Sequence, residues 1–374
     1  MNGCTPPTSQ HKKIKDGLKV NSLGIDVGKK KCRAALKDER GDIIREFFFS
    51  NNNEGISALI QSASHYGKCT AVVESTGNMW IRIHDTLEEN GIDTILANPY
   101  KTKIIAEAKI KSDKLDARIL ADLLRADLVY ESYVPTKEFR EKRSLVRHRI
   151  SLVRNRTILE NKVHSLLDKY DYKSDLTDIF GKSGIIWLKT LDVSNIDRLI
   201  MNTTLAAIEN INLQIDTVSK ELAKYGWDSY DVKILLSMTG IDVFSAMLLA
   251  TEIVDVKRFC TPWKLVSYAG LAPSTRESSG KTKTGRISKQ GSPWLRWILV
   301  QCAMTAVRYD QRLKSFYERL KSRKGSAKAI VATAKEILVI IWYMLTRREL
   351  YRHMNKKRYE QKLSRLKKIK ESSV

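Results

Sequence analysis

Four acidic residues in three short motifs have the types and spacing of a metal site. They are Asp26 in LGIDVGK, Glu74 in AVVESTG, and Asp113 and Asp116 in KSDKLDA. The first two each end an apolar run typical of a buried strand, and the last two are spaced to share one face of a helix. Four converging carboxylates repel one another unless a divalent cation neutralises them, and oxygen ligands suit Mg²⁺ or Mn²⁺. The motifs therefore predict a divalent-metal site, with Asp26 as the central bridging ligand.

The elements that must position these acids alternate between strand and helix over residues 20–130. Strands are expected at 22–27, 32–38, 43–49, 70–75 and 92–97, and helices at 53–66, 78–90, 99–110 and 112–127. A meander of three strands followed by αβαβα is the order of an α/β RNase H-like fold, whose first strand is central. An acid that ends this strand can then meet an acid that ends its neighbour.

Composition points to a polyanionic partner. The chain of 374 residues has 66 Lys and Arg against 42 Asp and Glu, a net charge of +24. This surplus favours nucleic acid, because neutralising phosphates releases condensed counterions; the alternative is a generic basic surface. The length is enough for two or three domains with cores of their own, and the apolar content of 43% argues against a disordered protein.

Other classes of protein have little support. The cysteines form no CxxC pair and no metal pattern with the histidines, which argues against a zinc module or a disulfide framework and for a reducing compartment. Residues 1–19 lack an apolar signal region and are expected to form a polar arm. The longest apolar stretch, 337–345, is too short to span a bilayer. We expect a soluble cytoplasmic, nucleoid-associated protein with no membrane contact.

Residues 131–228 are expected to form long helices with heptad spacing. The two apolar series are Leu145, Leu152, Leu159 and Leu166, and then Ile208, Ile211, Ile215, Val218, Leu222 and Tyr225. Such a seam fits either a dimerising coiled coil or an intramolecular hairpin. The first helix is also densely basic, so Arg147 and Arg154 are candidate contacts to a nucleic-acid backbone, although a solvated basic face is the plainer interpretation.

Residues 229–350 are expected to form a third, mostly helical domain, followed by a basic tail at 351–374 that could be helical. A helix–TGI–helix sequence at its start could direct N–H groups at a phosphate or simply form a tight turn. After GLAP, the segment STRESSGKTKTGRISKQGSP is expected to be a loop. Its serines could attack a phosphodiester if cations stabilise the developing charge. Nearby candidates for contact with nucleic acid are Lys281, Arg286, Lys289 and Arg296.

Two nucleotide-binding interpretations fit poorly. LGIDVGKKKC resembles the phosphate loop of actin-like sugar kinases, but GKK replaces their usual Gly-Thr or Gly-Gly and no second, similar half is visible. SGKT at 279–282 is not a P-loop, because Thr275 occupies the position of the first glycine.

The motifs GIDVGK, VVESTG, SDKLDA, GLAP, ESSGK, GRISKQG and WLRW, in this order, resemble the DEDD transposases of the insertion-sequence one-ten family. The likeness spans about residues 20–345. It implies a RuvC-like N-terminal domain with a magnesium-bound tetrad at Asp26, Glu74, Asp113 and Asp116, a coiled-coil middle, and a C-terminal transposase domain. It further implies a catalytic serine that bonds covalently to DNA, a structured guide RNA that pairs with donor and target DNA, and dimers that join into tetramers.

Two departures from the family pattern leave residue assignments open. Counting forward from Pro273 makes Ser278 the nucleophile, whereas counting back from Gly280 makes it Ser279; we favour Ser278. Asp242 stands where members often have a second glycine, which puts a backbone–phosphate contact there in doubt. The alternatives to an RNA-guided recombinase are a RuvC-like nuclease with water as nucleophile and a non-catalytic nucleic-acid-binding protein.

Overall fold

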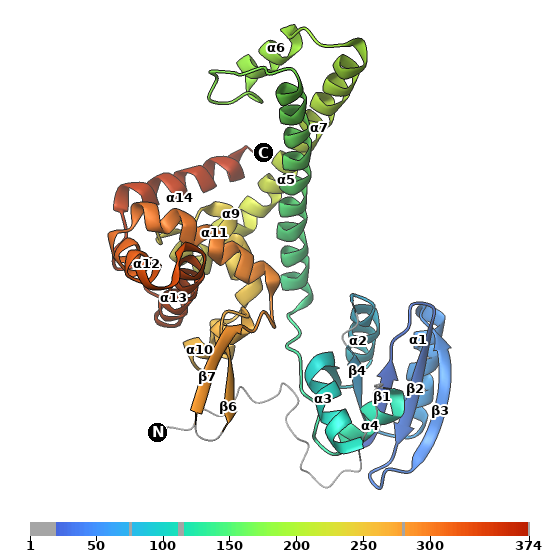
Figure 1. The fold of residues 1–374 in the computed structure, drawn as a ribbon. Helices are drawn as coiled ribbons and strands as arrows, with labels where there is room; N and C mark the ends of the chain where they lie inside the picture. Colours follow the sequence, from blue (N-terminus) through green and yellow to red (C-terminus); the bar gives the residue numbers. More distant parts are fainter. Residues whose placement is uncertain (1–19, 75–76, 111–115, 279–280, 373–374) are drawn as a thin grey trace. The chain divides into compact units, whose positions relative to one another are not determined.

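The computed structural model describes residues 20–74, 77–110, 116–278 and 281–372. The chain divides between Pro135 and Thr136 into two compact units. The first holds a five-stranded sheet with helices, and the second is mainly helical (Figure 1). The finer division of the second unit into linker, transposase domain and tail remains a prediction.

The first unit is built on a mixed sheet with β1 at its centre. Its strands are β1 (Asn21–Asp26), β2 (Lys31–Lys37), β3 (Ile43–Ser50), β4 (Cys69–Glu74) and β5 (Thr94–Ala97). β1, β2 and β3 form an antiparallel meander, while β4 and β5 add parallel strands, in the order β3-β2-β1-β4-β5. This is the strand order expected for an RNase H-like fold, and the prediction of a central first strand is confirmed.

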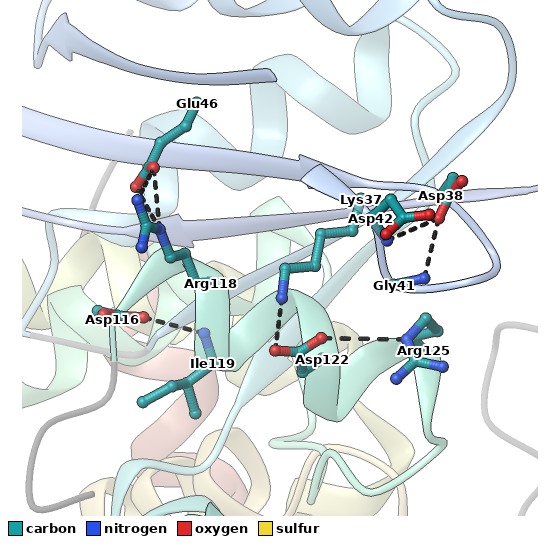
Figure 2. Close-up of polar contacts among 10 residues, drawn as sticks. All are labelled: Lys37, Asp38, Gly41, Asp42, Glu46, Asp116, Arg118, Ile119, Asp122 and Arg125. Atoms are coloured by element: carbon teal, nitrogen blue, oxygen red, sulfur yellow. Dashed lines mark hydrogen bonds and ion pairs between the residues drawn. The ribbon is translucent and has the colours of Figure 1, made fainter. Parts of the chain in front are cut away.

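The turn between β2 and β3 is fixed by a single carboxylate. Asp38 Oδ1 accepts hydrogen bonds from the backbone N–H groups of Gly41 and Asp42 (Figure 2) and from that of Arg40. These bonds hold the pKa of Asp38 below its usual value. Gly41 has φ +97°, a conformation that glycine adopts without the strain of a Cβ. The local sequence therefore determines the meander.

Side chains alternate along the strands, so successive residues belong to opposite faces of the sheet. Leu23 and Ile25 of β1 are buried with α1 (Asn53–His65) and α2 (Trp80–Glu89). The other face is covered by α4 (Ala117–Arg125), whose Leu120 is buried with Val72 and Ala97. α3 (Pro99–Ile110) precedes α4. Because side chains alternate along a strand, residue Asp26 of β1 and residue Glu74 of β4 belong to the α4 face.

In the second unit, two long helices pair within the chain. α5 (Lys137–Lys169) and α7 (Asn195–Asp228) lie side by side, with α6 (Lys182–Thr190) at their far end (Figure 1). The heptad positions Leu152, Ile215 and Leu222 are buried. The intramolecular hairpin that the heptads allowed is thus present, and a coiled coil between subunits remains a prediction.

The hairpin tip has an apolar cluster of its own. Val163 and Leu167 of α5 pack there with Leu188 of α6 and with Met201 and Leu205 of α7. At the other end of the hairpin, the buried residues belong to the main core of the unit. The tip can therefore lose its packing without disturbing the rest of the unit.

Met201→Ala is expected to destabilise the tip by about 2–5 kcal/mol, because Met201 is fully buried. Hydrogen exchange followed by mass spectrometry should lose protection over residues 159–208 and keep it in the main core. Leu213→Ala is the control, because Leu213 is 66% exposed on the same helix and should leave exchange unchanged. Loss of protection throughout the second unit would contradict a separate tip cluster.

The main core of the second unit brings together helices that are distant in sequence. They are α8 (Tyr230–Leu236), α9 (Val243–Ile253), α10 (Pro262–Tyr268), α11 (Pro293–Tyr309), α12 (Gln311–Lys324), α13 (Ser326–Arg347) and α14 (Lys356–Glu371). Ser292 caps α11: its Oγ accepts from the Leu295 N–H, and Pro293 opens the helix. The basic tail forms α14, and its Leu366 is buried in this core.

One helix among the described residues, α13, is long and apolar enough to cross a membrane. Its Ile337, Leu338 and Ile341 are fully buried in the main core of the second unit. It contacts α10, α11 and α12, as the central helix of a globular core does. This is weak support for a membrane span.

The prediction of a loop after GLAP is wrong in part, because the segment contains an antiparallel pair of strands. β6 (Pro273–Ser278) pairs with β7 (Lys281–Ile287), and Ser278 lies opposite Lys281 in the register. The segment has few apolar residues, so the period-two pattern that marks a half-buried strand is absent from its sequence. Main-chain hydrogen bonds form this ribbon without an apolar face of its own.

Candidate active site

Asp26 and Glu74 lie side by side at one edge of the sheet. Each is the last residue of its strand, and β1 and β4 are parallel neighbours with Ile25 opposite Val73. Ile25 and Val73 are both buried on the α1–α2 face. The next residue in each strand therefore projects from the α4 face, so the two carboxylates share one edge and one face. Both residues are half-buried.

Asp116 joins this face from α4, but not as a residue within a helix. Its backbone is extended, with φ −107° and ψ 172°, and its Oδ1 accepts from the Ile119 N–H at 2.9 Å (Figure 2). It is the N-cap of α4. The expectation that a helix over 112–127 carries Asp113 and Asp116 on one face is therefore wrong at Asp116. The carboxylate accepts from one of the N–H groups that have no partner within the helix at the start of α4.

Gly24 allows α4 to lie this close to the central strand. A Cβ on Gly24 would be 2.0 Å from the carbonyl oxygen of Ala117 and 2.6 Å from the nitrogen of Ala121. Both are backbone atoms of α4, which cannot rotate away. Since Asp116 precedes Ala117, a glycine at position 24 is what brings the start of α4, and its capping carboxylate, onto β1.

The three described carboxylates influence one another. Burial is the main cause that raises the pKa of Asp26; the charge of Asp116 raises it further, and Arg33 opposes this. Burial also raises the pKa of Glu74, and the charge of Asp26 adds to the effect. Mutual repulsion between partly buried acids is the condition that a bound divalent cation relieves. The set of hard oxygen donors fits Mg²⁺ or Mn²⁺.

The predicted tetrad is brought together only in part. Asp26 and Glu74 are neighbours, Asp116 lies within electrostatic range of Asp26, and Asp113 lies outside the described residues. Within the described part of the chain, no group of three or more His, Cys, Asp or Glu side chains has the arrangement of a metal site. The magnesium site therefore remains a prediction.

The second candidate centre is at the end of the β6–β7 hairpin. Ser278 is the last residue of β6, whereas Ser279 lies outside the described residues. Of the four cations predicted nearby, Arg286 and Lys289 are exposed, and the side chain of Lys281 belongs to the undescribed part. Their contacts with nucleic acid stay predictions.

The fourth cation, Arg296, anchors the base of this hairpin. Its Nη1 donates to the carbonyl oxygens of Lys289 at 3.1 Å and Ala269 at 3.3 Å. Lys289 has φ +56°, so its carbonyl is held in a strained turn. Arg296 therefore links α11 to both ends of the hairpin segment.

Arg147 and Arg154 of α5 face α11. Arg147 Nε donates at 2.8 Å to Oε1 of Glu252, which is fully buried in α9. The hydroxyl of Ser292 donates to Oε2 of Glu252 at 2.9 Å. The guanidinium of Arg154 lies 5.0 Å and 4.9 Å from the ring centroids of Trp294 and Trp297. Arg147 thus ties α5 to α9 and to the start of α11, and its contact with nucleic acid is untested.

Glu252 was missed in the sequence, although a signal was present. It is the one charged residue in the apolar run 243–253, and an acid there requires a partner. The partner, Arg147, lies more than a hundred positions away in the chain, so the run alone does not identify it.

In the helix–TGI–helix turn, the carboxylate of Asp242 caps the second helix. Asp242 Oδ1 accepts from the Ser245 N–H at 2.8 Å and caps α9. Beside it lies a cavity of about 370 Å³, bordered by Lys362, whose amine donates to the carbonyls of Leu236 and Met238. Burial lowers the pKa of Lys362 to about 8. A carboxylate at this helix start agrees with the doubt about a phosphate contact there.

Comparison with known proteins identifies the class. A family model described as "Transposase" matches residues 23–171, which contain the four acids. A second, described as "Transposase IS116/IS110/IS902 family", matches residues 232–318, which contain the β6–β7 hairpin. The chain is thus a transposase by family. The first matched region covers the sheet unit and continues through α5, and the second lies within the helical unit.

Curated relatives match over most of their length. The transposase for insertion sequence element IS1111A of Coxiella burnetii is 26% identical over 346 residues, 89% of this chain and 92% of the relative. The transposase for insertion sequence element IS1328 of Yersinia enterocolitica is 24% identical over 339 residues, 87% and 97% of the two chains. The putative transposase y4qE of Sinorhizobium fredii is 26% identical over 333 residues, 87% and 82%. The chain belongs to the IS110 family of DEDD transposases.

Proposed function

We propose that this transposase is an RNA-guided DNA recombinase that cuts and exchanges strands with a magnesium-bound acidic site and a serine nucleophile. The observation that carries the proposal is the convergence of Asp26, Glu74 and Asp116 on one face, where the charge of Asp116 raises the pKa of Asp26 and the charge of Asp26 raises the pKa of Glu74. The acidic face belongs to a chain with a net charge of +24, which favours a polyanionic substrate.

The acids have one task in this proposal and the serine another. Asp26, Glu74, Asp113 and Asp116 would hold Mg²⁺, or Mn²⁺, which when bound supplies charge neutralisation at the scissile phosphate. The RNase H-like arrangement of the sheet supports this role, because the central strand and its parallel neighbour end together. Asp116 is positioned by the cap that it makes to α4.

Ser278 would attack the phosphodiester through its hydroxyl oxygen. The serine loses its proton, a phosphoserine bond forms, and the bond to the leaving-strand oxygen breaks, with that oxygen taking up a proton. Attack by a hydroxyl of the incoming strand reverses these changes and releases the serine, so the energy of the phosphodiester is conserved and no ATP is needed. The place of Ser278 at the end of β6 supports this choice.

The guide RNA and the oligomer are part of the proposal, and the resemblance of the motifs to the family supports them. A structured non-coding RNA would pair with donor and target DNA, and the chain would act as a dimer or tetramer. The basic composition supports two nucleic-acid partners. Sequencing the RNA that co-purifies with the protein tests the guide, and the mass of the assembly in solution tests the oligomer.

Trapping on a suicide DNA substrate tests the chemistry. Wild-type protein with Mg²⁺ should form an adduct that survives denaturant, Ser278→Ala should lose it, and Ser279→Ala should keep it. Asp26→Asn should lower the cleavage rate by at least about 10³-fold, the scale on which single members of a catalytic unit act.

Three other outcomes would contradict parts of the proposal. An adduct lost only in Ser279→Ala would move the nucleophile by one residue. Metal-dependent cleavage that survives replacement of both serines would identify a nuclease with water as nucleophile. Absence of cleavage with any metal, while Asp26→Ala still binds DNA tightly, would leave a non-catalytic binding protein.

A further inference from the structure

A solvent-exposed aromatic ring lies on the same face of the sheet as the acids. Phe48 of the edge strand β3 is 59% exposed, although a phenylalanine of this sheet has an apolar core available on the other face. Its neighbours Phe47 and Phe49 do pack into that core. Burial of apolar surface thus accounts for Phe47 and Phe49 but not for Phe48.

The register of the strands connects this ring to the acidic cluster. Phe48 lies opposite Arg33 of β2, and Arg33 lies opposite Asp26 of β1. Glu46, two residues before Phe48 and therefore on the same face, pairs with Arg118 of α4 (Figure 2). Asp26, Arg33 and Phe48 therefore form a row across β1, β2 and β3 on the α4 face of the sheet. α4 packs mainly on β1 and β2, so it does not cover this face at the edge strand β3.

Two cations accompany the ring. Lys31 Nζ lies 4.3 Å and the guanidinium carbon of Arg33 5.7 Å from the centroid of Phe48. Lys29 and Lys30, in the turn after Asp26, are exposed. Arg33 is held in place by an ion pair with Glu46, whereas the lysines are exposed. An exposed aromatic ring with exposed lysines around it is the combination with which proteins bind unpaired nucleotides: the base stacks on the ring and the cations contact the backbone.

We propose that Phe48 is a stacking platform for an unpaired base of the DNA strand that enters the acidic site, with Lys31 directed at the adjoining phosphate and Arg33 held beside the ring by Glu46. The inference rests on the proposed function for the identity of the strand. DNA is favoured over other occupants because the row ends at the carboxylates that would act on its backbone. A base that stacks on the ring displaces the Lys31 amine, the nearer of the two cations, which can then lie beside the phosphate.

The test measures binding alone, with the full chain in EDTA so that no cleavage occurs. The probe is a single-stranded deoxyoligonucleotide carrying 2-aminopurine, whose fluorescence falls when the base stacks on an aromatic ring. Binding is measured at raised salt, because this weakens phosphate contacts elsewhere on the basic surface of the protein. Phe48→Ala should weaken binding roughly 5- to 100-fold and abolish the quenching, as loss of one stacked base does. Phe48→Trp should restore both.

Two matched variants control for the loss of an exposed aromatic side chain and for the loss of a positive charge beside the ring. Tyr66→Ala removes an exposed aromatic side chain near the opposite end of β1, where the Tyr66 carbonyl accepts from Asn21, and should leave binding within twofold. Lys31→Ala should reduce the salt dependence of binding and keep the quenching. Duplex DNA of the same sequence should bind Phe48→Ala and wild type equally.

Each contrary result has a distinct meaning. Unchanged quenching in Phe48→Ala would overturn the stacking platform. If the protein–DNA adduct still forms normally, the proposed function survives this result. A loss seen with single-stranded RNA and not with DNA would assign the ring to the guide and overturn the proposal. A change of oligomeric state in Phe48→Ala, with DNA binding intact, would make β3 a subunit contact. Loss of quenching in a protein that never cleaves would sustain the platform and refute the recombinase.

Discussion

Gly24→Ala is expected to remove the response of the first unit to magnesium and to destabilise it by about 1–3 kcal/mol or more, the usual cost of overpacking. The new methyl group would lie 2.0 Å from the Ala117 carbonyl oxygen, so α4 must move away from β1. Asp116 is the cap of that helix and moves with it. In wild type, Mg²⁺ or Mn²⁺ should raise the melting temperature by mass action, and in the variant this increment should vanish.

A second glycine separates the loss of the site from a general loss of stability. Gly91 has φ +75° with no atom within 4 Å of an added Cβ, so Gly91→Ala should cost about 1–2 kcal/mol through backbone strain alone. It should keep the magnesium increment, because α4 is undisturbed. A Gly24→Ala protein that still responds fully to magnesium would show that the position of α4 does not matter for the metal.

Arg147→Met is expected to lower the free energy of unfolding of the second unit by about 3–5 kcal/mol, because it leaves the buried Glu252 carboxylate without its cation. The remaining described hydrogen-bond partner of that carboxylate is the Ser292 hydroxyl, which does not neutralise a charge. Urea unfolding followed by circular dichroism measures the change. Arg154→Met, in the same helix, is the control and should cost far less, because Arg154 is exposed.

A double variant identifies the cause. Arg147→Met with Glu252→Leu removes both charges and should recover much of the loss, since a buried ion pair replaced by apolar groups is often neutral. A double variant as unstable as Arg147→Met would mean that the arginine acts through packing against Trp294, 5.5 Å from its guanidinium, and not through its charge.

The first unit was largely predictable from the sequence because its signals are local. The apolar runs that end at Asp26 and Glu74 became β1 and β4, and the ERGD turn between β2 and β3 contains the residues that fix it. The central position of β1 followed from the order of elements alone. Strand ends were correct to about one residue, because polar residues mark them, except that β5 begins at Thr94 and not at 92.

The parts that sequence reasoning missed depend on contacts between distant residues. The start of α4 was placed at 112, whereas the helix begins at Ala117, because both Ser112 and Asp116 are plausible caps and packing on Gly24 decides between them. The β6–β7 ribbon has no apolar face to reveal it. The Arg147–Glu252 pair joins segments more than a hundred positions apart, and heptads alone do not say whether a seam closes within one chain or between two.

The length of the α5–α7 hairpin amplifies any tilt at its base into a larger displacement of its tip. Helices of 33 and 34 residues extend about 50 Å at the usual rise of 1.5 Å per residue. Only their base shares the main core of the unit, through Val146, Ile150, Leu222 and Ala223. About 20 residues of each helix, or roughly 30 Å, lie between that base and the tip cluster, so a tilt of about 5° at the base would move the tip by roughly 3 Å. Small repacking around the base is therefore magnified at the far end, where the tip moves as a preassembled block.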